Sequence, residues 1–184
     1  VTVEDGPGID VLVSSNFSYW NTSGVINSGA TIAGLGQFQF GGTSFVNNGT
    51  IEMPCIVIPG INPNTDPKIF SGSGTFSTLT MNSIYHVNLA SDITITNLLN
   101  FNNGFINTGS YKVTLAASAQ PIQNNSGTDW YVNGNLEVTF PSGTSSYLYR
   151  VGDNQGYRPV TITLFNSPNA TGKVIVSTSN PDHP

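Results

Sequence analysis

One short motif returns along this sequence at a regular interval, and that interval restricts the fold more than any other feature. The motif is an apolar pair followed by Asn-x-Gly, and it occurs at residues 25–29, 45–49 and 105–109. Asn27 and Asn47 are 20 residues apart, and Asn107 follows Asn47 after 60 residues, three times that interval. A second motif, Gly-x-Gly-x-Phe, occurs at residues 34–38 and 72–76, a step of 38 residues that is close to two intervals. Two independent motifs with a common spacing indicate a repeat architecture.

A repeat of about 20 residues is typical of one coil of a parallel β-helix, in which short strands are joined by tight corners. The apolar pair supplies an inward-facing residue just before a corner, and the Asn-x-Gly tolerates the left-handed backbone that a sharp corner requires. We therefore expect Asn27, Asn47 and Asn107 to lie at the same corner of different coils, with their amides stacked in a ladder about 4.8 Å apart. The alternative is that Asn-Gly closes β-hairpins in a sandwich or barrel, but hairpin turns do not by themselves predict such an interval.

The rest of the chain also indicates an all-β protein. Short apolar alternations are separated by Gly, Asn and Pro, and no segment follows a helical period. Residues 93–102 are the best candidate for a helix, but they contain Thr and Asn and begin with strict alternation, so we expect a strand. Prolines interrupt the repeat at residues 54–68, which predicts a loop that projects from one coil, with residues 55–58 returning to the core.

The pattern changes near residue 130, where the expected strands become longer and more amphipathic. We expect residues 1–130 to form a parallel β-helix and residues 131–184 to form an antiparallel β segment, either a half-sandwich or a cap. A cap is needed because the last coil of a solenoid exposes unpaired backbone groups and apolar surface. The N-terminal residues show no comparable cap, so we expect a longer polypeptide or a neighbouring subunit to cover that end.

Composition limits the classes of partner. Only 8% of the residues are charged, against about 25% in a typical globular protein, and the net charge is −5. Five Lys and Arg residues cannot neutralise a nucleic-acid backbone, so we expect no binding to nucleic acid. No apolar run approaches the roughly 20 residues of a membrane span, so we expect no membrane insertion. Low charge with abundant Asn, Ser, Thr and Gly is typical of exported proteins and predicts an extracellular or cell-surface location.

The chain resembles the β-helical repeat modules of very large surface and secreted proteins of Bacteroidota that use the type nine secretion route. The residues that carry the resemblance are 45–51, the Gly-x-Gly-x-Phe at 72–76, 89–95 and 156–162. The resemblance implies a modular adhesin or an extracellular scaffold, with no catalytic residues to transfer from the family. It covers most of the chain, although the sequence lacks the export signal of a full protein of that type.

Few residues suggest a catalytic or metal site. His86 is expected to point outward from a strand, and Cys55 to be a small buried apolar residue; their spacing is not that of metal ligands. The acids are scattered and no nucleophile motif is present, so we expect no catalytic residues and no cofactor or metal. At Asp153 we favour a turn over a calcium site. The acidic group at residues 4–10 is a second candidate for calcium binding.

Five aromatic residues are candidates for a face that packs against sugar rings, with a role in the core or cap as the favoured alternative. They are Trp130, Tyr131, Tyr147, Tyr149 and Tyr157.

These observations predict a non-enzymatic structural module. It is either an adhesin stalk segment or a subunit of a surface fibre that stacks head to tail with copies of itself or with neighbouring modules. Two alternatives stay open. One is a carbohydrate-binding module that recognises surface glycans through the five aromatic residues, and the other is a polysaccharide lyase or hydrolase, which the β-helix fold supports by analogy only.

Overall fold

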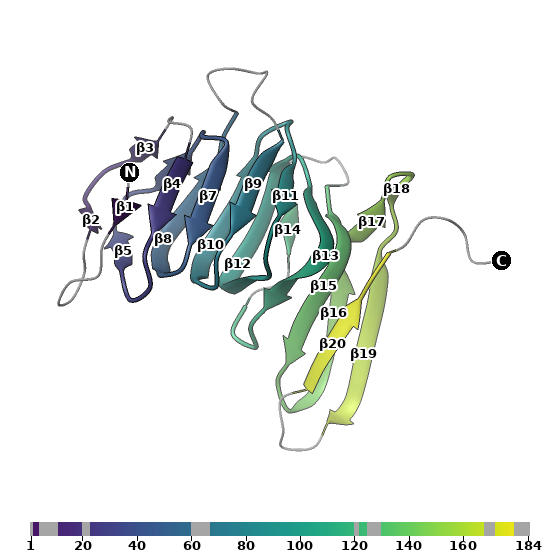
Figure 1. Cartoon of the computed structure of the whole chain (residues 1–184). Helices are drawn as coiled ribbons and strands as arrows, with labels where there is room; N and C mark the ends of the chain where they lie inside the picture. The colour runs from purple at the N-terminus through teal and green to yellow at the C-terminus, as the bar shows by residue number, and fades with distance from the viewer. Residues whose placement is uncertain are drawn as a thin grey trace.

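The structure, a computed structural model, describes residues 2–3, 11–19, 23–59, 67–119, 122–124, 130–167 and 172–178. Every regular element in these segments is a β-strand, and the strands stack in parallel into about six coils that are about 21 residues apart. Figure 1 shows the coils following one another from the N-terminal strands in purple to the green strand β15. The predicted parallel β-helix is therefore confirmed. In the segments that the structure describes, no helix long and apolar enough to cross a membrane is found.

The coils present three faces, each a ladder of parallel strands. Face A consists of β1 (Thr2–Val3), β4 (Ser23–Ile26), β7 (Ser44–Asn47), β9 (Lys68–Ser71), β11 (Val87–Leu89), the first residues of β13 (Ile106–Leu115) and of β15 (Val132–Phe140), and β17 (Val151–Asp153). Face B consists of β2 (Val11–Val13), β5 (Thr31–Gly34), the first residues of β8 (Thr50–Val57), of β10 (Thr75–Asn82) and of β12 (Ile93–Asn103), and the last residues of β13 and β15. Face C consists of β3 (Phe17–Tyr19), β6 (Phe38–Phe40), the last residues of β8, β10 and β12, and β14 (Gln123–Asn124).

The core lies inside the coils because alternate side chains of each strand point inward. On face B one inward column runs through six coils, and each of its residues is buried; its members are Ile32, Ile51, Phe76, Ile95, Leu115 and Val138. Aromatic rings fill the N-terminal coils, where the ring centroid of Phe45 lies 5.0 Å from that of Phe40 and 5.5 Å from that of Phe70. Strand β12 covers residues 93–102, so the expectation of a strand there is confirmed.

The proline-rich segment behaves as expected where the structure describes it. Residues 54–57 belong to β8, and Cys55 and Val57 are fully buried in the core. The predicted loop lies largely at residues 60–66, outside the described residues. Beyond it, Lys68 points into the coil, and its ammonium group donates hydrogen bonds to the carbonyl oxygens of Gly41 and Gly42.

Parallel pairing continues past residue 130, the limit expected from the sequence. Strand β15 pairs in parallel with β13, and β17 pairs in parallel with β15. This happens because Val132 and Leu136 extend the inward columns of Ile106 and Val113, and both are fully buried. The last solenoid coil is thus formed by residues that the sequence assigned to the antiparallel segment.

Antiparallel strands follow that coil. Strand β20 (Gly172–Val176) pairs antiparallel with β15, β16 (Gly143–Tyr149) pairs with β19 (Val160–Ser167), and β17 pairs with β18 (Gly156–Tyr157). Figure 1 shows β16, β19 and β20 together at the C-terminal end of the solenoid. Side chains of Phe140, Tyr147 and Tyr149 pack against one another there, with ring centroids 5.4 to 6.5 Å apart. These strands therefore cover the end of the core.

Candidate functional site

An asparagine ladder runs along the outer side of face A. The amide of Asn107 donates to Asn88 Oδ1 at 2.8 Å, and the amide of Asn133 donates to Asn107 Oδ1 at 2.8 Å. Asn133 also donates to Asn154 Oδ1 at 3.1 Å, so four side chains in successive coils are linked. Each amide carries both a donor and an acceptor, which lets the chain of bonds continue without a charge.

The predicted ladder through Asn27, Asn47 and Asn107 is wrong. Stacked asparagine amides do bond to one another, but at other asparagines. On face A, Ile26 is the partner of Asn47, which places Asn27 one position beyond Asn47. Asn47 is 1% exposed and faces the interior, where its amide donates to the Thr75 carbonyl oxygen at 3.1 Å. Asn107 instead pairs with Asn88 on the outer side. The interval between the first two coils is 21 residues rather than 20, which shifts Asn27 by one residue from Asn47. Asn107 is in register with Ser44, three residues before Asn47.

An aromatic column lies beside the ladder, two residues before each of its first three asparagines. His86, Phe105 and Tyr131 directly precede β11, β13 and β15, and a fully buried residue separates each of them from its asparagine. Alternate residues point to the same side, so the three rings lie on the outer side together with Asn88, Asn107 and Asn133. The ring of Phe105 stacks on His86 at 3.4 Å and on Tyr131 at 5.5 Å between centroids. The sequence carries a signal for both columns that the repeat analysis missed: an aromatic residue, a β-branched residue and Asn, at 86–88, 105–107 and 131–133.

The five aromatic residues predicted to face sugars do not form one platform. Tyr149 is 0% and Tyr147 8% exposed, and their hydroxyl groups bond to the backbone, Tyr149 to Val174 O and Tyr147 with Ile122 N. Trp130 packs against the core cluster. These three side chains therefore belong to the core and its C-terminal end, where Tyr147 and Tyr149 pack against Phe140.

The other two, Tyr131 and Tyr157, stack on each other with their centroids 6.2 Å apart. Tyr131 is 9% exposed and donates a hydrogen bond to the carbonyl oxygen of Asp153 at 2.8 Å. The Arg150 guanidinium lies 5.5 Å from the centre of the Tyr157 ring. Ring faces are therefore covered by neighbouring groups, which leaves little flat aromatic surface for a sugar at this place.

A protrusion breaks the regular coil where face A meets face B. Asn107 pairs with Asn133 and Lys112 with Asn135, so four residues, 108–111, stand opposite the single residue Gly134. Thr108 stays buried, whereas Gly109, Ser110 and Tyr111 are exposed. Bulges of this kind often occur next to functional sites, because they redirect side chains out of the regular ladder.

Two polar grooves adjoin the protrusion. The first, called the amide groove, has a volume of about 370 Å³ and is lined by Asn107, Gly109, Asn133, Gly134, Asp153, Asn154 and Thr178. The second, called the tyrosine groove, has a volume of about 360 Å³ and is lined by Asp92, Ser110, Tyr111, Lys112, Asn135, Ile175 and Ser177. Consecutive residues of the same three segments line the two grooves, and these segments are the protrusion, β15 and the residues that follow β20.

An ion-pair network fixes the wall of the tyrosine groove. Glu137 Oε2 lies 2.8 Å from Lys112 Nζ, and Glu137 Oε1 lies 3.0 Å from Lys173 Nζ. Burial by itself raises the pKa of Glu137, but the hydrogen bonds and charges of the two lysines outweigh it and hold the pKa below its usual value. Glu137 is therefore ionised at neutral pH, and with both oxygen atoms bound by lysines it is suited to holding strands together rather than to proton transfer.

Other expected features have structural roles. Asp153 accepts a hydrogen bond from the Gln155 backbone N–H at 2.8 Å and from Arg158 Nε at 2.8 Å, which confirms the predicted turn. Burial raises the pKa of the Cys55 thiol, so the thiolate is suppressed. Within the described residues no group of three or more His, Cys, Asp or Glu side chains could hold a metal ion. The acidic group at residues 4–10 lies outside those residues.

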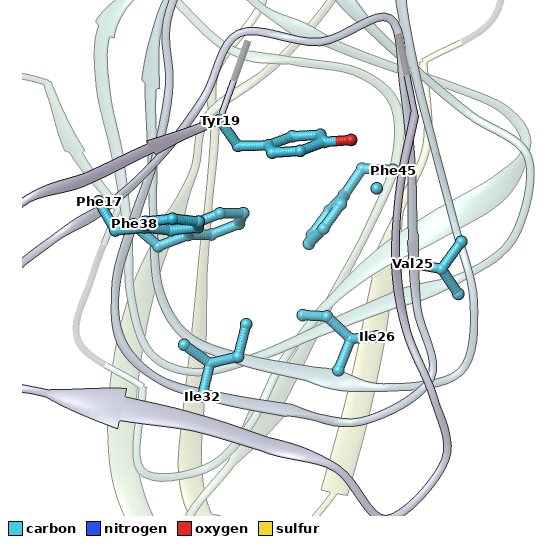
Figure 2. A pocket seen from close by; sticks show the side chains of 8 residues that line it. Phe17, Tyr19, Val25, Ile26, Ile32, Phe38 and Phe45 are labelled. Carbon is cyan, nitrogen blue, oxygen red and sulfur yellow. The ribbon is translucent and has the colours of Figure 1, made fainter. Parts of the chain in front are cut away.

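An apolar hollow lies inside the N-terminal coils. Figure 2 shows the aromatic and aliphatic side chains that face it, with Val25 pointing away; the facing residues are Phe17, Tyr19, Ile26, Ile32, Phe38 and Phe45. About 20 Å³ of it is free, room for at most one water molecule. The hollow results from imperfect packing at the end of the core. Its lining is almost entirely apolar, so it offers no polar group to a ligand.

The chemistry gathered on this surface is that of hydrogen bonding by amides, hydroxyls and one ion-pair network. Asn107, Asn133 and Asn135 present amide groups whose orientations are fixed by neighbouring bonds. Such an arrangement can bind a polar ligand. In comparisons with family models, with curated proteins and with solved structures, no match to this chain was found.

Proposed function

We propose that the chain is a non-enzymatic structural module of an extracellular or cell-surface protein. The observation that carries this proposal is the continuity of the parallel ladders, which run through about six coils on three faces. Backbone hydrogen bonds parallel to the axis and a dry apolar interior make such a coil a stiff rod. The asparagine ladder adds side-chain bonds in the same direction.

The ends of the rod favour a stalk segment over a fibre subunit. At the C-terminal end β20 already occupies the edge of β15 on face B, and this pairing is antiparallel. A second copy cannot add its first coil in parallel at an edge that is filled. At the other end β1, β2 and β3 each pair with one strand among those described, so this edge is the one suited to a preceding module or to another copy. The low charge of the chain and its resemblance to modules of large Bacteroidota surface proteins point to the same role, and they stay predictions.

The enzymatic alternative receives no support from the ionisable groups that the structure describes. The most buried carboxylate, Glu137, is bound by two lysines, and Asp153 is bound by Arg158 and by its own turn. The aromatic residues first considered for carbohydrate binding do not support that alternative, because Tyr147 and Tyr149 are buried and cannot contact a sugar ring.

Electron microscopy and small-angle X-ray scattering of the purified chain, over a wide range of concentration, test the proposal. A stalk segment is expected to give monodisperse elongated particles at every concentration. Filaments that form at high concentration would favour the fibre subunit instead. Compact particles, or the release of products from polysaccharide substrates, would contradict a structural role.

A further inference from the structure

We propose that the amide groove and the tyrosine groove together bind a neutral oligosaccharide. This binding site is independent of the structural role proposed above. It uses residues that the repeat pattern did not single out as a site, above all Tyr111, Asp92 and Asn135.

The site is built where the connection between face A and face B changes length from coil to coil. Five residues, 108–112, join Asn107 to Val113, whereas four join the corresponding residues of the preceding coil and two join those of the next coil. The residues after β20 form another wall, where the backbone N–H of Thr178 donates to the Gly134 carbonyl oxygen and its hydroxyl donates to that of Gly152. Three segments far apart in the sequence thus converge on one surface.

The polar groups in the grooves are held in place before any ligand arrives. Asn135 Nδ2 donates to the Tyr111 carbonyl oxygen at 2.7 Å, which ties β15 to the protrusion. Asp92 Oδ1 accepts a hydrogen bond from the Lys112 backbone N–H at 3.1 Å, and the Lys112 ammonium is fixed by Glu137. Groups that are already ordered lose little entropy on binding, which favours affinity.

The chemistry of the walls selects the class of ligand. Amides, hydroxyls and carboxylates supply donors and acceptors side by side, as the hydroxyl groups of a sugar require. The formal charges balance, since Asp92 and Glu137 face Lys112 and Lys173, so neither an anionic nor a cationic ligand is favoured. Tyr111 is 38% exposed and brings an aromatic ring to the rim, where the apolar side of a sugar ring can pack.

The size and openness of the site select an oligomer. Each groove has a volume of about 360 to 370 Å³, near the lower end of the range for small-molecule sites, and the two lie on either side of one protrusion. A chain of linked sugar units can occupy both grooves and cross the protrusion at Gly109. No side chain stands there, and nothing lies within 4 Å of the place where a Cβ of Gly109 would be.

Binding of the whole chain to a panel of linear neutral hexasaccharides of glucose, mannose, galactose and xylose, measured by isothermal titration calorimetry, tests the site. At least one series is expected to bind. Tyr111→Ala and Asp92→Asn are each expected to weaken that binding about tenfold, and Asn at position 92 still accepts the Lys112 bond. Phe165→Ala is the control, because Phe165 is 77% exposed on β19 and lines neither groove.

Deletion of Ser110 is the second variant, since it shortens the connection between Asn107 and Val113 to the four residues of the preceding coil and should weaken binding at least tenfold, while the circular dichroism spectrum stays that of a β-protein. The proposal is overturned if no neutral hexasaccharide binds at millimolar concentration, if only charged sugars bind, or if binding survives both Tyr111→Ala and the deletion. None of these results bears on particle shape, so failure of this site and failure of the structural role can be told apart.

Discussion

The contact between Gly134 and Thr108 shows how one residue permits the protrusion. Gly134 has φ of +116°, a left-handed conformation that side chains rarely adopt, and a Cβ there would lie 2.1 Å from Thr108 Oγ1. The Thr108 hydroxyl is buried and accepts a hydrogen bond from the Asn135 backbone N–H at 2.9 Å. A residue other than glycine would have to displace this hydroxyl and strain the backbone as well.

Gly134→Ala is therefore expected to lower the free energy of unfolding by about 1–3 kcal/mol, because strain and the loss of a buried hydrogen bond add together. Urea denaturation followed by circular dichroism measures the change. Gly172→Ala is the matched control, since nothing lies within 4 Å of its Cβ position, and it should leave the free energy of unfolding almost unchanged. Equal effects of the two substitutions would contradict this explanation of the protrusion.

At the scale of elements, one carboxylate adds to the backbone pairing that attaches β20 to β15. Glu137 on β15 binds Lys112 on β13 and Lys173 on β20, so a single side chain links three strands. Thr114 adds a hydrogen bond to the same carboxylate at 3.3 Å. Because the folded protein holds the pKa of Glu137 below its usual value, the carboxylate stabilises the fold above the pKa of the unfolded chain, about 4.3. That contribution is lost as the pH falls through the lower pKa of the folded state.

We expect Glu137→Gln to reduce the free energy of unfolding at pH 7 by about 1–3 kcal/mol, because two ammonium groups lose their charged partner. The difference between the variant and the original chain should shrink as the pH falls below about 4. Denaturation curves measured from pH 7 to pH 3 test this dependence. Glu52→Gln serves as the control because Glu52 is exposed, and it should show little effect. A constant difference at every pH would show that the ion pairs are not its source.

At the scale of the whole molecule, stability is distributed along an axis. Each coil contacts its neighbours, so central coils are held from both sides and the first coil from one. Strands β1, β2 and β3 pair only with β4, β5 and β6 within the segments described, whereas β10 pairs with both β8 and β12. The C-terminal coil is protected by β20 and by the packed rings of β16.

Hydrogen exchange followed by mass spectrometry should therefore show the fastest exchange in β2 and β3 and the slowest in β10 and β12. The gradient follows from the number of neighbouring coils rather than from the local sequence. If copies of the chain stack through the N-terminal edge, protection of β2 and β3 should increase with protein concentration. Uniform exchange along the chain would contradict a rod built of stacked coils.

Composition and spacing were sufficient for the fold class, because apolar alternation, turn residues and a repeated interval are local properties of the chain. The same reasoning predicted the strand at residues 93–102, the buried Cys55 and the turn at Asp153, and the structure confirms each of them. It did not find the tyrosine groove, because Asp92, Lys112 and Ser177 come together only when different coils and the end of β20 meet.

Two of the three copies of the Asn-x-Gly motif show what local sequence does not determine and tertiary structure does. Phe45-Val46-Asn47 and Phe105-Ile106-Asn107 are almost identical, yet Phe45 and Asn47 are buried while Phe105 and Asn107 lie on the outer side. The chain by itself determined that both are strands that end near a corner. Which side chains face the core was decided by pairing with the neighbouring coils. The two motifs are offset by three residues along face A, and an odd shift moves every side chain of a strand to the opposite face.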